Sequence, residues 1–312
     1  MSNEFLQKEQ RARKGDYTVD LDSINFLSSL NRILQKEIDY KDKKIRKPFI
    51  FVLGLPRSGT TLLTQLLCDC LDVGYIDNIA ARFWLAPLIG IKLSKAILGN
   101  KRKTKYESDF GETICISDPH EFTYFWHYWL MMKEEQDFYC KDLHIDEINW
   151  KDFYQTMASI QNEFDKPIVM KGILSAYYMK KITEVLDNVI WIYIERNLHD
   201  VCWSILEARK RHYNSFKEWW GTLPPNYLEI IKLSPLKQIK EQVYSLRDVY
   251  DKKIKQVQPK TICISYKDVC DNPKLILGRI KEKCNVDILK YPPSSFKMNT
   301  YSDKFGEFNA DR

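Results

Sequence analysis

The chain has 312 residues, 44% of them hydrophobic and 13% aromatic, which is enough for a sizeable core in one large domain or two small ones. Its 48 basic and 42 acidic residues leave a net charge of +6, which suits an anionic ligand but is too mild to indicate nucleic acid. The eight cysteines show neither metal-ligand spacing nor a disulfide framework, and no apolar run approaches the ~20 residues that span a bilayer. Because the first 16 residues also lack the apolar core of a signal peptide, we expect a cytoplasmic protein without a membrane or nucleic-acid partner.

Strand patterns and helix patterns alternate along the chain. Apolar runs predict strands over residues 48–55, 168–171, 189–195 and 260–266. Helical spacing of apolar residues predicts helices over residues 21–41, 60–71, 122–132, 176–186, 235–257 and 273–284. This alternation indicates an α/β fold with a parallel sheet between layers of helices. Ligands of such sheets gather at the carboxyl ends of the strands, where Arg57, Lys171, Arg196 and Tyr266 lie.

Residues 49–63 predict a buried strand, a tight loop and the start of a helix, which is the geometry of a phosphate-binding loop. The two glycines of the loop are spaced as in the Walker A pattern G-x-x-x-x-G-K-[ST]. However, Thr60 replaces the Walker lysine and is followed by Thr61, and a cation stands inside the loop at Arg57. The loop therefore suits a phosphate-like group, but not the usual chemistry of a magnesium–nucleoside triphosphate.

Two later stretches complete a pattern with this loop. Residues 189–204 predict a strand that ends before Arg196 and a helix that carries Ser204 eight residues further on. Residues 262–273 predict a strand, a turn at Tyr266 and a helix that starts at Asn272-Pro273. Together with the Pro-Arg-Ser-Gly-Thr-Thr loop, they resemble the sulfotransferases that use 3′-phosphoadenosine-5′-phosphosulfate (PAPS). The resemblance covers roughly residues 48–285 and is closest in kind to the soluble bacterial small-molecule sulfotransferases.

The resemblance implies a P-loop-like three-layer fold and a defined reaction. A sulfuryl group would pass from PAPS to a hydroxyl or amine of a small-molecule acceptor, and adenosine-3′,5′-bisphosphate would be the other product. The donor-binding residues that the resemblance implies are Arg57, Ser58, Gly59, Thr60, Thr61, Arg196, Ser204 and Tyr266. Among them Arg57 would stabilise the leaving group, and Arg196 and Ser204 would bind the 3′-phosphate. We expect no metal, because side-chain cations can meet the negative charge that develops on the leaving group.

We expect one sulfotransferase domain over residues 1–312. It would consist of an N-terminal helical extension to about residue 45, a nucleotide-binding core over about 48–285 and a tail over 286–312. The pattern makes no prediction of the oligomeric state.

The catalytic base is not fixed by the pattern. The cytosolic branch of the family has a Lys-Thr-His run that supplies a histidine base, but here Lys171 is followed by Gly172 and Ile173, so only the lysine matches. We expect Lys171 near the phosphosulfate or at a solvated strand end. The base would then come from another segment, or an acceptor amine would need none.

The alternative base lies in residues 117–122, which resemble a Pro-His-Glu-Phe stretch of bacterial small-molecule sulfotransferases. Asp118 and Pro119 fit the N-cap and first positions of a helix, so that His120 and Glu121 would face out of its first turn. Either side chain is a candidate base, and we prefer His120 slightly.

Aromatic residues gather at 122–129 and again at 216–220. The first cluster has helical spacing, which is typical of a core, and the second lies in a turn-rich stretch that fits a lid over the acceptor. Acidic residues between 107 and 121 favour a cationic acceptor. Part of the tail, near residues 299–306, is expected to fold over the nucleotide.

Two other functions stay open. A P-loop kinase-like phosphotransferase is disfavoured by the missing Walker lysine and by the lack of a magnesium-binding aspartate after the strand at 189–195. A non-catalytic nucleotide-binding protein would bind the donor without turnover.

Overall fold

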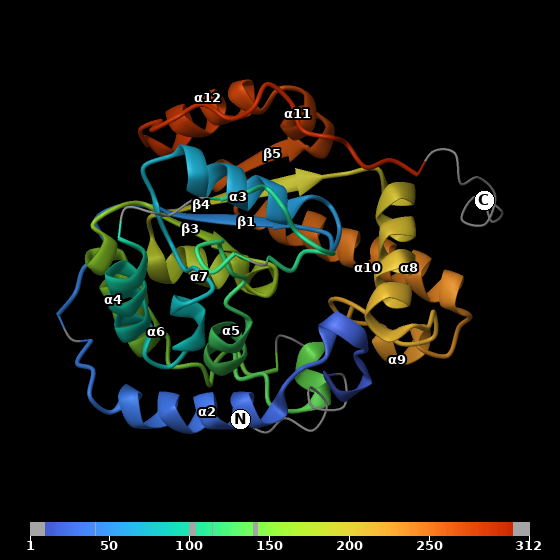
Figure 1. Cartoon of the computed structure of the whole chain (residues 1–312), viewed down its shortest axis with the longest axis horizontal. Coiled ribbons are helices and arrows are strands. Elements are labelled where there is room, and N and C mark those ends of the chain that lie inside the picture. Colours follow the sequence, from blue (N-terminus) through green and yellow to red (C-terminus); the bar gives the residue numbers. More distant parts are fainter. Residues whose placement is uncertain (1–9, 41, 100–103, 114, 140–142, 302–312) are drawn as a thin grey trace.

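The computed structural model describes residues 10–40, 42–99, 104–113, 115–139 and 143–301. Within these ranges five strands form one parallel sheet in the order β2-β3-β1-β4-β5. The strands are β1 (Phe49–Gly54), β2 (Gly74–Tyr75), β3 (Ile168–Lys171), β4 (Val189–Glu195) and β5 (Thr261–Ser265). Helices cover both faces of the sheet, so the predicted α/β, P-loop-like three-layer fold is confirmed (Figure 1).

Strand β1 lies at the centre of the sheet because its side chains are apolar on both faces. Phe49, Phe51 and Leu53 pack into the larger of two buried clusters, and Ile50 and Val52 into the smaller. All six residues of the strand are buried, as expected for a parallel strand covered on both sides.

The neighbours of β1 bring the ends of three strands together. Val52 pairs with Lys171 on β3, and Gly54 pairs with Ile194 on β4. Because the strands are parallel, their carboxyl ends meet at one edge of the sheet, where an α/β fold binds its ligands.

Two groups of helices make the outer layers. One face of the sheet is covered by α3 (Thr60–Cys70), α11 (Tyr266–Asp271) and α12 (Pro273–Cys284). The helices that supply the cluster on the other face are α4 (Pro87–Leu98), α5 (Thr123–Trp129), α6 (Trp150–Phe164), α7 (Met179–Leu186), α8 (Leu198–Tyr213), α9 (Tyr227–Ile230) and α10 (Pro235–Gln256). Short 3-10 turns occur at η1 (Gly15–Tyr17), η2 (Ala80–Arg82), η3 (Glu135–Phe138), η4 (Ser175–Tyr178) and η5 (Gln258–Lys260). No helix in the described part of the chain is long and apolar enough to cross a membrane.

Helix α2 (Leu21–Gln35) lies along the outside of the larger layer (Figure 1). Asp20 caps its N-terminus by accepting bonds from the backbone N–H groups of Asp22 and Ser23. The buried Asn31 fastens it to the body of the protein, because its amide donates to the carbonyl of Arg82 at 2.8 Å and accepts from the N–H of Leu85 at 2.8 Å.

The expected helix over 122–132 is shorter than predicted. Helix α5 begins at Thr123, and Phe122 before it has a left-handed φ of 57°. Asp118 and Pro119 are therefore not its N-cap and first residue, and this prediction is wrong. Pro119 instead makes a bridge with Asp77, and the Asp118 carboxylate accepts from the N–H of Cys115 at 3.3 Å within a turn.

Candidate active site

The loop between β1 and α3, residues 55–59, encloses a space at the N-terminus of α3. It closes with a bond from the Ser58 N–H to the Leu55 carbonyl at 3.0 Å. Arg57 has a left-handed φ of 69°, which is uncommon for a non-glycine residue and rarer still outside Asn and Asp. Gly59 has a φ of 103°, and a Cβ at this position would lie 2.4 Å from the Tyr266 ring. Only glycine fits there, so the loop is held in one shape by its own backbone and by Tyr266.

Arg57 points from this loop toward helix α8. Its Nε donates to Ser204 Oγ at 2.9 Å, and its guanidinium lies 5.0 Å from the centre of the Phe110 ring. Burial and the neighbouring Arg196 lower the pKa of Arg57 to about 10. The side chain therefore stays charged at neutral pH.

Arg196, which follows β4, joins four parts of the chain. Its Nη1 donates to the Arg57 carbonyl at 2.6 Å, and its Nη2 donates to the Asn299 carbonyl at 2.6 Å. Its guanidinium also stacks 4.7 Å from the centre of the Tyr266 ring. The loop, the ends of β4 and β5 and the tail thus meet at one arginine.

Two polar atoms of this region are buried without a hydrogen-bond partner in the described part of the chain, namely Ser58 Oγ and Arg196 Nε. Buried polar groups are normally paired, so an unpaired donor at a site needs an explanation such as a ligand. Both atoms belong to residues that the sequence assigns to the donor.

The tail reaches the same region. The Tyr301 N–H donates to Asp200 at 2.8 Å, and its hydroxyl donates to Glu207 at 2.6 Å, so Tyr301 lies against α8. The segment expected over the nucleotide, 299–306, is described only as far as Tyr301, and its remaining residues lie outside the described part.

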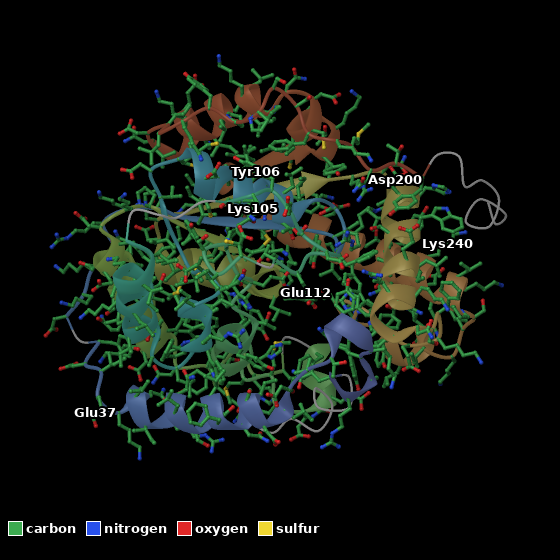
Figure 2. All side chains as sticks on the ribbon, in the orientation of Figure 1. Glu37, Lys105, Tyr106, Glu112, Asp200 and Lys240 are labelled. Carbon is green, nitrogen blue, oxygen red and sulfur yellow. The ribbon has the colours of Figure 1, made fainter. Side chains whose placement is uncertain are left out.

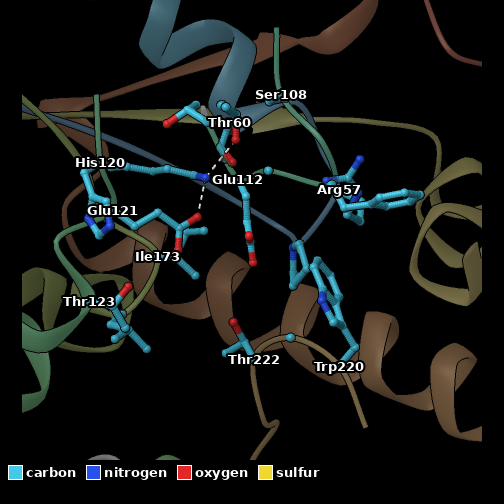
Figure 3. Close-up of a pocket in the computed structure, with 18 of the residues that line it drawn as sticks. Arg57, Thr60, Ser108, Glu112, His120, Glu121, Thr123, Ile173, Trp220 and Thr222 are labelled. Carbon is cyan, nitrogen blue, oxygen red and sulfur yellow. Dashed lines mark hydrogen bonds and ion pairs between the residues drawn. The ribbon is translucent and has the colours of Figure 1, made fainter. Parts of the chain in front are cut away.

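Lys171 is buried at the end of β3, with 5% of its side chain exposed, and is not a solvated strand end. Its Nζ donates to Thr61 Oγ1 at 2.8 Å and forms an ion pair with Glu121 (Figure 3). Glu121 lines a cavity, which leaves 42% of its side chain exposed. Its carboxyl group is nevertheless surrounded by enough protein for burial to influence its pKa. Burial raises the pKa of Glu121, but the charge and hydrogen bond of Lys171 outweigh it and hold this pKa below its usual range. The carboxylate is therefore ionised at neutral pH and open to the cavity.

His120 precedes Glu121 in the chain, but its ring is hydrogen-bonded to the backbone and not to a charged side chain. Its Nδ1 accepts the backbone N–H of Phe122 at 2.8 Å. A neutral imidazole has one acceptor nitrogen, so the proton must then reside on Nε2. Burial lowers the pKa of His120 to about 4, which keeps the ring neutral at pH 7. Because its only lone pair is used inside the protein, His120 offers the cavity a donor rather than a base.

These residues surround one cavity of about 1720 Å³. Its wall includes nine of the eleven predicted site residues, Arg57, Gly59, Thr60, Thr61, His120, Glu121, Lys171, Arg196 and Tyr266. The remaining two, Ser58 and Ser204, are buried next to it, and Ser204 contacts Arg57. In the described part of the chain, no group of three or more His, Cys, Asp or Glu residues is arranged to hold a metal ion.

The aromatic clusters divide between core and cavity. Phe122 and Phe125 are buried in the core, whereas Tyr124 and Trp126 reach the cavity wall. From the expected lid, Trp219 and Trp220 line the cavity, together with Thr222 beyond them (Figure 3). The expected lid residue Phe216 is not part of the cavity wall; its side chain is 45% exposed.

Sequence reasoning missed the part of the wall that residues 108–113 make. Glu112 and Gly111 line the cavity opposite Lys171, and Figure 3 shows Glu112 directed into the space between Glu121 and Trp220. The sequence signals for this segment are a single glycine and the acidic residues Asp109 and Glu112, which suggest a cationic acceptor but are too weak to place a loop.

Comparison of the sequence with models of known protein families identifies the class of protein. A sequence model of the sulfotransferase family matches residues 48–290. The chain belongs to this family, and the P-loop kinase-like alternative is correspondingly disfavoured.

Among solved structures, the chain is similar to sulfotransferase STF1 from Mycobacterium tuberculosis H37Rv, with 13% identity and a TM-score of 0.52, over 94% of this chain and 86% of that one. It is also similar to sulfotransferase STF9 from Mycobacterium avium, with 15% identity and a TM-score of 0.51, over 85% of this chain and 71% of that one. At these identities the likeness concerns the fold alone. No curated protein matches the chain.

Proposed function

We propose that this sulfotransferase uses PAPS as its donor and transfers the sulfuryl group to a hydroxyl or amine of a small molecule. One observation carries the proposal: Arg57 and Arg196, which follow different strands, meet in one site, with Arg196 Nη1 2.6 Å from the Arg57 carbonyl. Besides burial, the positive charge of Arg196 lowers the pKa of Arg57, and a ligand with anionic groups at both ends relieves this repulsion. The unpaired Arg196 Nε supplies a further donor for it.

In this proposal the 5′-phosphosulfate lies on the β1–α3 loop and the 3′-phosphate lies on Arg196 and Ser204. The loop N–H groups, the N-terminus of α3 and the hydroxyls of Thr60 and Thr61 face the 5′ end. Tyr266 holds Arg196 by stacking, and the tail at Asn299 encloses the 3′ end.

The acceptor oxygen or nitrogen attacks sulfur, and the bond from sulfur to the bridging phosphate oxygen breaks. Adenosine-3′,5′-bisphosphate leaves with the electron pair, and Arg57 and Lys171 meet the charge that develops on the bridging oxygen. Glu121 takes the acceptor's proton, because its ionised carboxylate faces the cavity beside Lys171, and His120 orients the segment that carries it.

The rest of the cavity is the proposed acceptor site. Trp219, Trp220 and Tyr124 offer apolar contact. Glu112 and Glu121 place carboxylates in the wall, paired with Arg13 and Lys171, and we propose that a cationic acceptor group competes with these cations for them. We propose that residues 1–312 act as one domain, that no metal takes part, and that the scattered cysteines reflect a reducing compartment such as the cytoplasm.

Calorimetry with adenosine-3′,5′-bisphosphate, ADP and ATP tests the donor. The bisphosphate should bind most tightly, and Arg196→Ala should weaken it by about 1.5–3 kcal/mol, or roughly 10- to 150-fold, as for hydrogen bonds to charged groups. AMP, which lacks the 3′-phosphate, should be almost unaffected by the substitution, and Arg247→Ala, on the partly exposed face of α10, serves as a matched control. Equal losses for AMP and the bisphosphate would remove Arg196 from the 3′ site.

Turnover should survive EDTA, because Arg57 and Lys171 replace a metal in the proposal. A strict magnesium requirement would favour the kinase-like alternative. Tight bisphosphate binding without sulfuryl transfer to any of a broad set of alcohols and amines would favour the non-catalytic one.

A further inference from the structure

Residues Asp109–Glu112 form a small hairpin above the β1–α3 loop. Its ends are joined by two bonds of 2.9 Å, from the N–H of each end residue to the carbonyl of the other. The two central residues both have left-handed dihedrals, with φ of 47° for Phe110 and 97° for Gly111. Such a turn favours glycine at these positions, so Phe110 is held there against its own preference.

Gly111 stands where three donors converge. A Cβ built on it would lie 3.5 Å from Arg57 Nη1, 3.6 Å from Thr61 Oγ1 and 4.0 Å from Lys171 Nζ. A tetrahedral anion that accepts hydrogen bonds of about 2.9 Å has its central atom at roughly this distance from each donor. The Gly111 Cα lies only about 1.5 Å from that point, one carbon–carbon bond away. The hairpin backbone and a sulfuryl or phosphoryl group cannot both occupy it.

Side chains from two other elements hold the hairpin there. The Tyr17 hydroxyl donates to the Asp109 carboxylate, and Arg211 on α8 lies 3.7 Å from the same carboxylate. Arg13 pairs with Glu112 at 2.9 Å. Figure 2 shows Glu112 toward the middle of the outline, whereas Glu37 and Lys240 lie at its edge. We call the contacts of Asp109 with Tyr17 and Arg211 the latch.

The latched arrangement leaves a polar group unsatisfied beneath it. His212 is 1% exposed, its ring centre lies 3.9 Å from that of Tyr17 and 6.1 Å from that of Phe110, and neither ring nitrogen has a partner in the described residues. A neutral imidazole always carries one N–H, and leaving it buried and unpaired is unfavourable. The unpaired His212 ring and the left-handed backbone of Phe110 both cost free energy in the closed hairpin. A competing ligand can therefore displace the hairpin.

We propose that the hairpin is a latch-held plug of the position that the 5′-phosphate or 5′-phosphosulfate group takes, which the 5′ end of the donor must displace in order to bind. The inference rests on the proposed donor site. It follows that the apparent affinity for the donor is reduced by the small fraction of molecules with an open hairpin, and that weakening the latch raises this fraction.

The test measures binding of adenosine-3′,5′-bisphosphate, whose 5′-phosphate competes for the same position, to the full chain by stopped flow and calorimetry. Tyr17→Phe keeps the ring on His212 but removes the hydroxyl, and Asp109→Asn removes the charge that Arg211 meets. Each should speed association and tighten binding by about three- to tenfold, the effect of a several-fold larger open fraction. The matched controls, Tyr244→Phe and Asp248→Asn on exposed α10, should match the wild-type protein.

Hydrogen exchange gives an independent readout in the unaltered chain. The Asp109 and Glu112 amides, which bond each other's carbonyls, should exchange faster when the bisphosphate is bound, because the hairpin is expelled. Slower exchange of these amides on binding, or weaker or unchanged affinity in both latch variants, would overturn the plug while leaving the donor assignment intact. Failure of wild-type and latch variants alike to bind the bisphosphate would overturn the donor assignment and the plug with it.

Discussion

The β1–α3 loop and the segment from residue 108 to 122 line the same cavity, but their side chains are held in place by different kinds of contact. The loop is positioned by its own backbone turn, through the bond from Ser58 to Leu55, and by close packing of Gly59 against the Tyr266 ring and the bond from Arg196 to the Arg57 carbonyl. The segment is positioned by residues far away in the sequence. Glu121 depends on Lys171, and the hairpin depends on Tyr17, Arg13 and Arg211.

The difference separates two tasks. A loop fixed by local geometry can present donors to an anion without reorganising, which is what a strong electrostatic site needs. A segment held by distant side chains can shift when those contacts break, and it carries the proposed base and plug. Substitutions in the loop should therefore weaken binding or lower stability, and substitutions around the segment should change turnover, its pH dependence and the fraction of molecules with an open hairpin.

The largest effect should come from Glu121→Gln. It keeps the shape of the side chain and an oxygen for Lys171, but it removes the ability to accept a proton. We expect kcat to fall by about 10²–10⁴-fold, the usual contribution of a general base, with the affinity for adenosine-3′,5′-bisphosphate almost unchanged. Single-turnover sulfuryl transfer and calorimetry measure the two quantities.

Glu184→Gln, on exposed α7, is the matched control and should behave like the wild-type protein. A parallel loss of donor affinity in Glu121→Gln would mean that the carboxylate shapes the loop rather than taking the proton. Near-native kcat would show that the proton leaves by another route, and would favour an amine as the acceptor.

The next largest effect tests how rigidly the β1–α3 loop is held. Gly59→Ala places a methyl group 2.4 Å from the Tyr266 ring at a φ of 103°, whereas Gly15→Ala has a φ of 59° and open space around the new methyl. Both substitutions carry the cost of a left-handed backbone, about 1–2 kcal/mol, but only the first must also displace Tyr266. We expect Gly59→Ala to lower the free energy of unfolding by at least about 1 kcal/mol more than Gly15→Ala, as measured with urea. Equal losses would mean that the loop yields easily, contrary to the comparison.

A smaller effect should appear in the pH profile of Lys171→Met. Without the lysine, the burial that raises the pKa of Glu121 is opposed only by the weaker influence of His120 and Arg57, so this pKa should move above its usual range. The base works only when deprotonated, so the acid limb of kcat/KM should shift to higher pH. Lys180→Met, on exposed α7, is the control. An unmoved acid limb would show that this limb reports another group.

The contrast between the β1–α3 loop and the segment from residue 108 to 122 also explains which features the sequence could predict. The parallel α/β fold and the β1–α3 loop follow from periodicity and spacing within short stretches, and Arg196 and Tyr266 follow from their places at strand ends. The start of α5 could not be read in this way, because Pro119 is used in a bridge with Asp77 and not in a helix. The hairpin and its latch join residues about 90 to 100 positions apart, as Tyr17 and Asp109 do, and such pairs leave no local pattern.

The sequence could not rank the two candidate bases either. It slightly favours His120, whereas the contacts of the two side chains support Glu121. His120 Nδ1 accepts the Phe122 N–H at 2.8 Å, and Asn carries an oxygen that can accept the same bond. His120→Asn should therefore preserve the turn and lower kcat by less than about tenfold, well below the 10²–10⁴-fold typical of a lost base.

Burial already lowers the pKa of His120 to about 4, so the substitution should leave the profile of kcat/KM between pH 6 and 8 unchanged. His120 and Glu121 are adjacent, so His120→Asn and Glu121→Gln should be assayed with the same acceptor. A 10²-fold or larger fall for His120→Asn, with Glu121→Gln near wild type, would reverse the ranking. It would also require the Phe122 N–H to release Nδ1 during the reaction, which would make the segment before α5 a moving part of the site and not a fixed one.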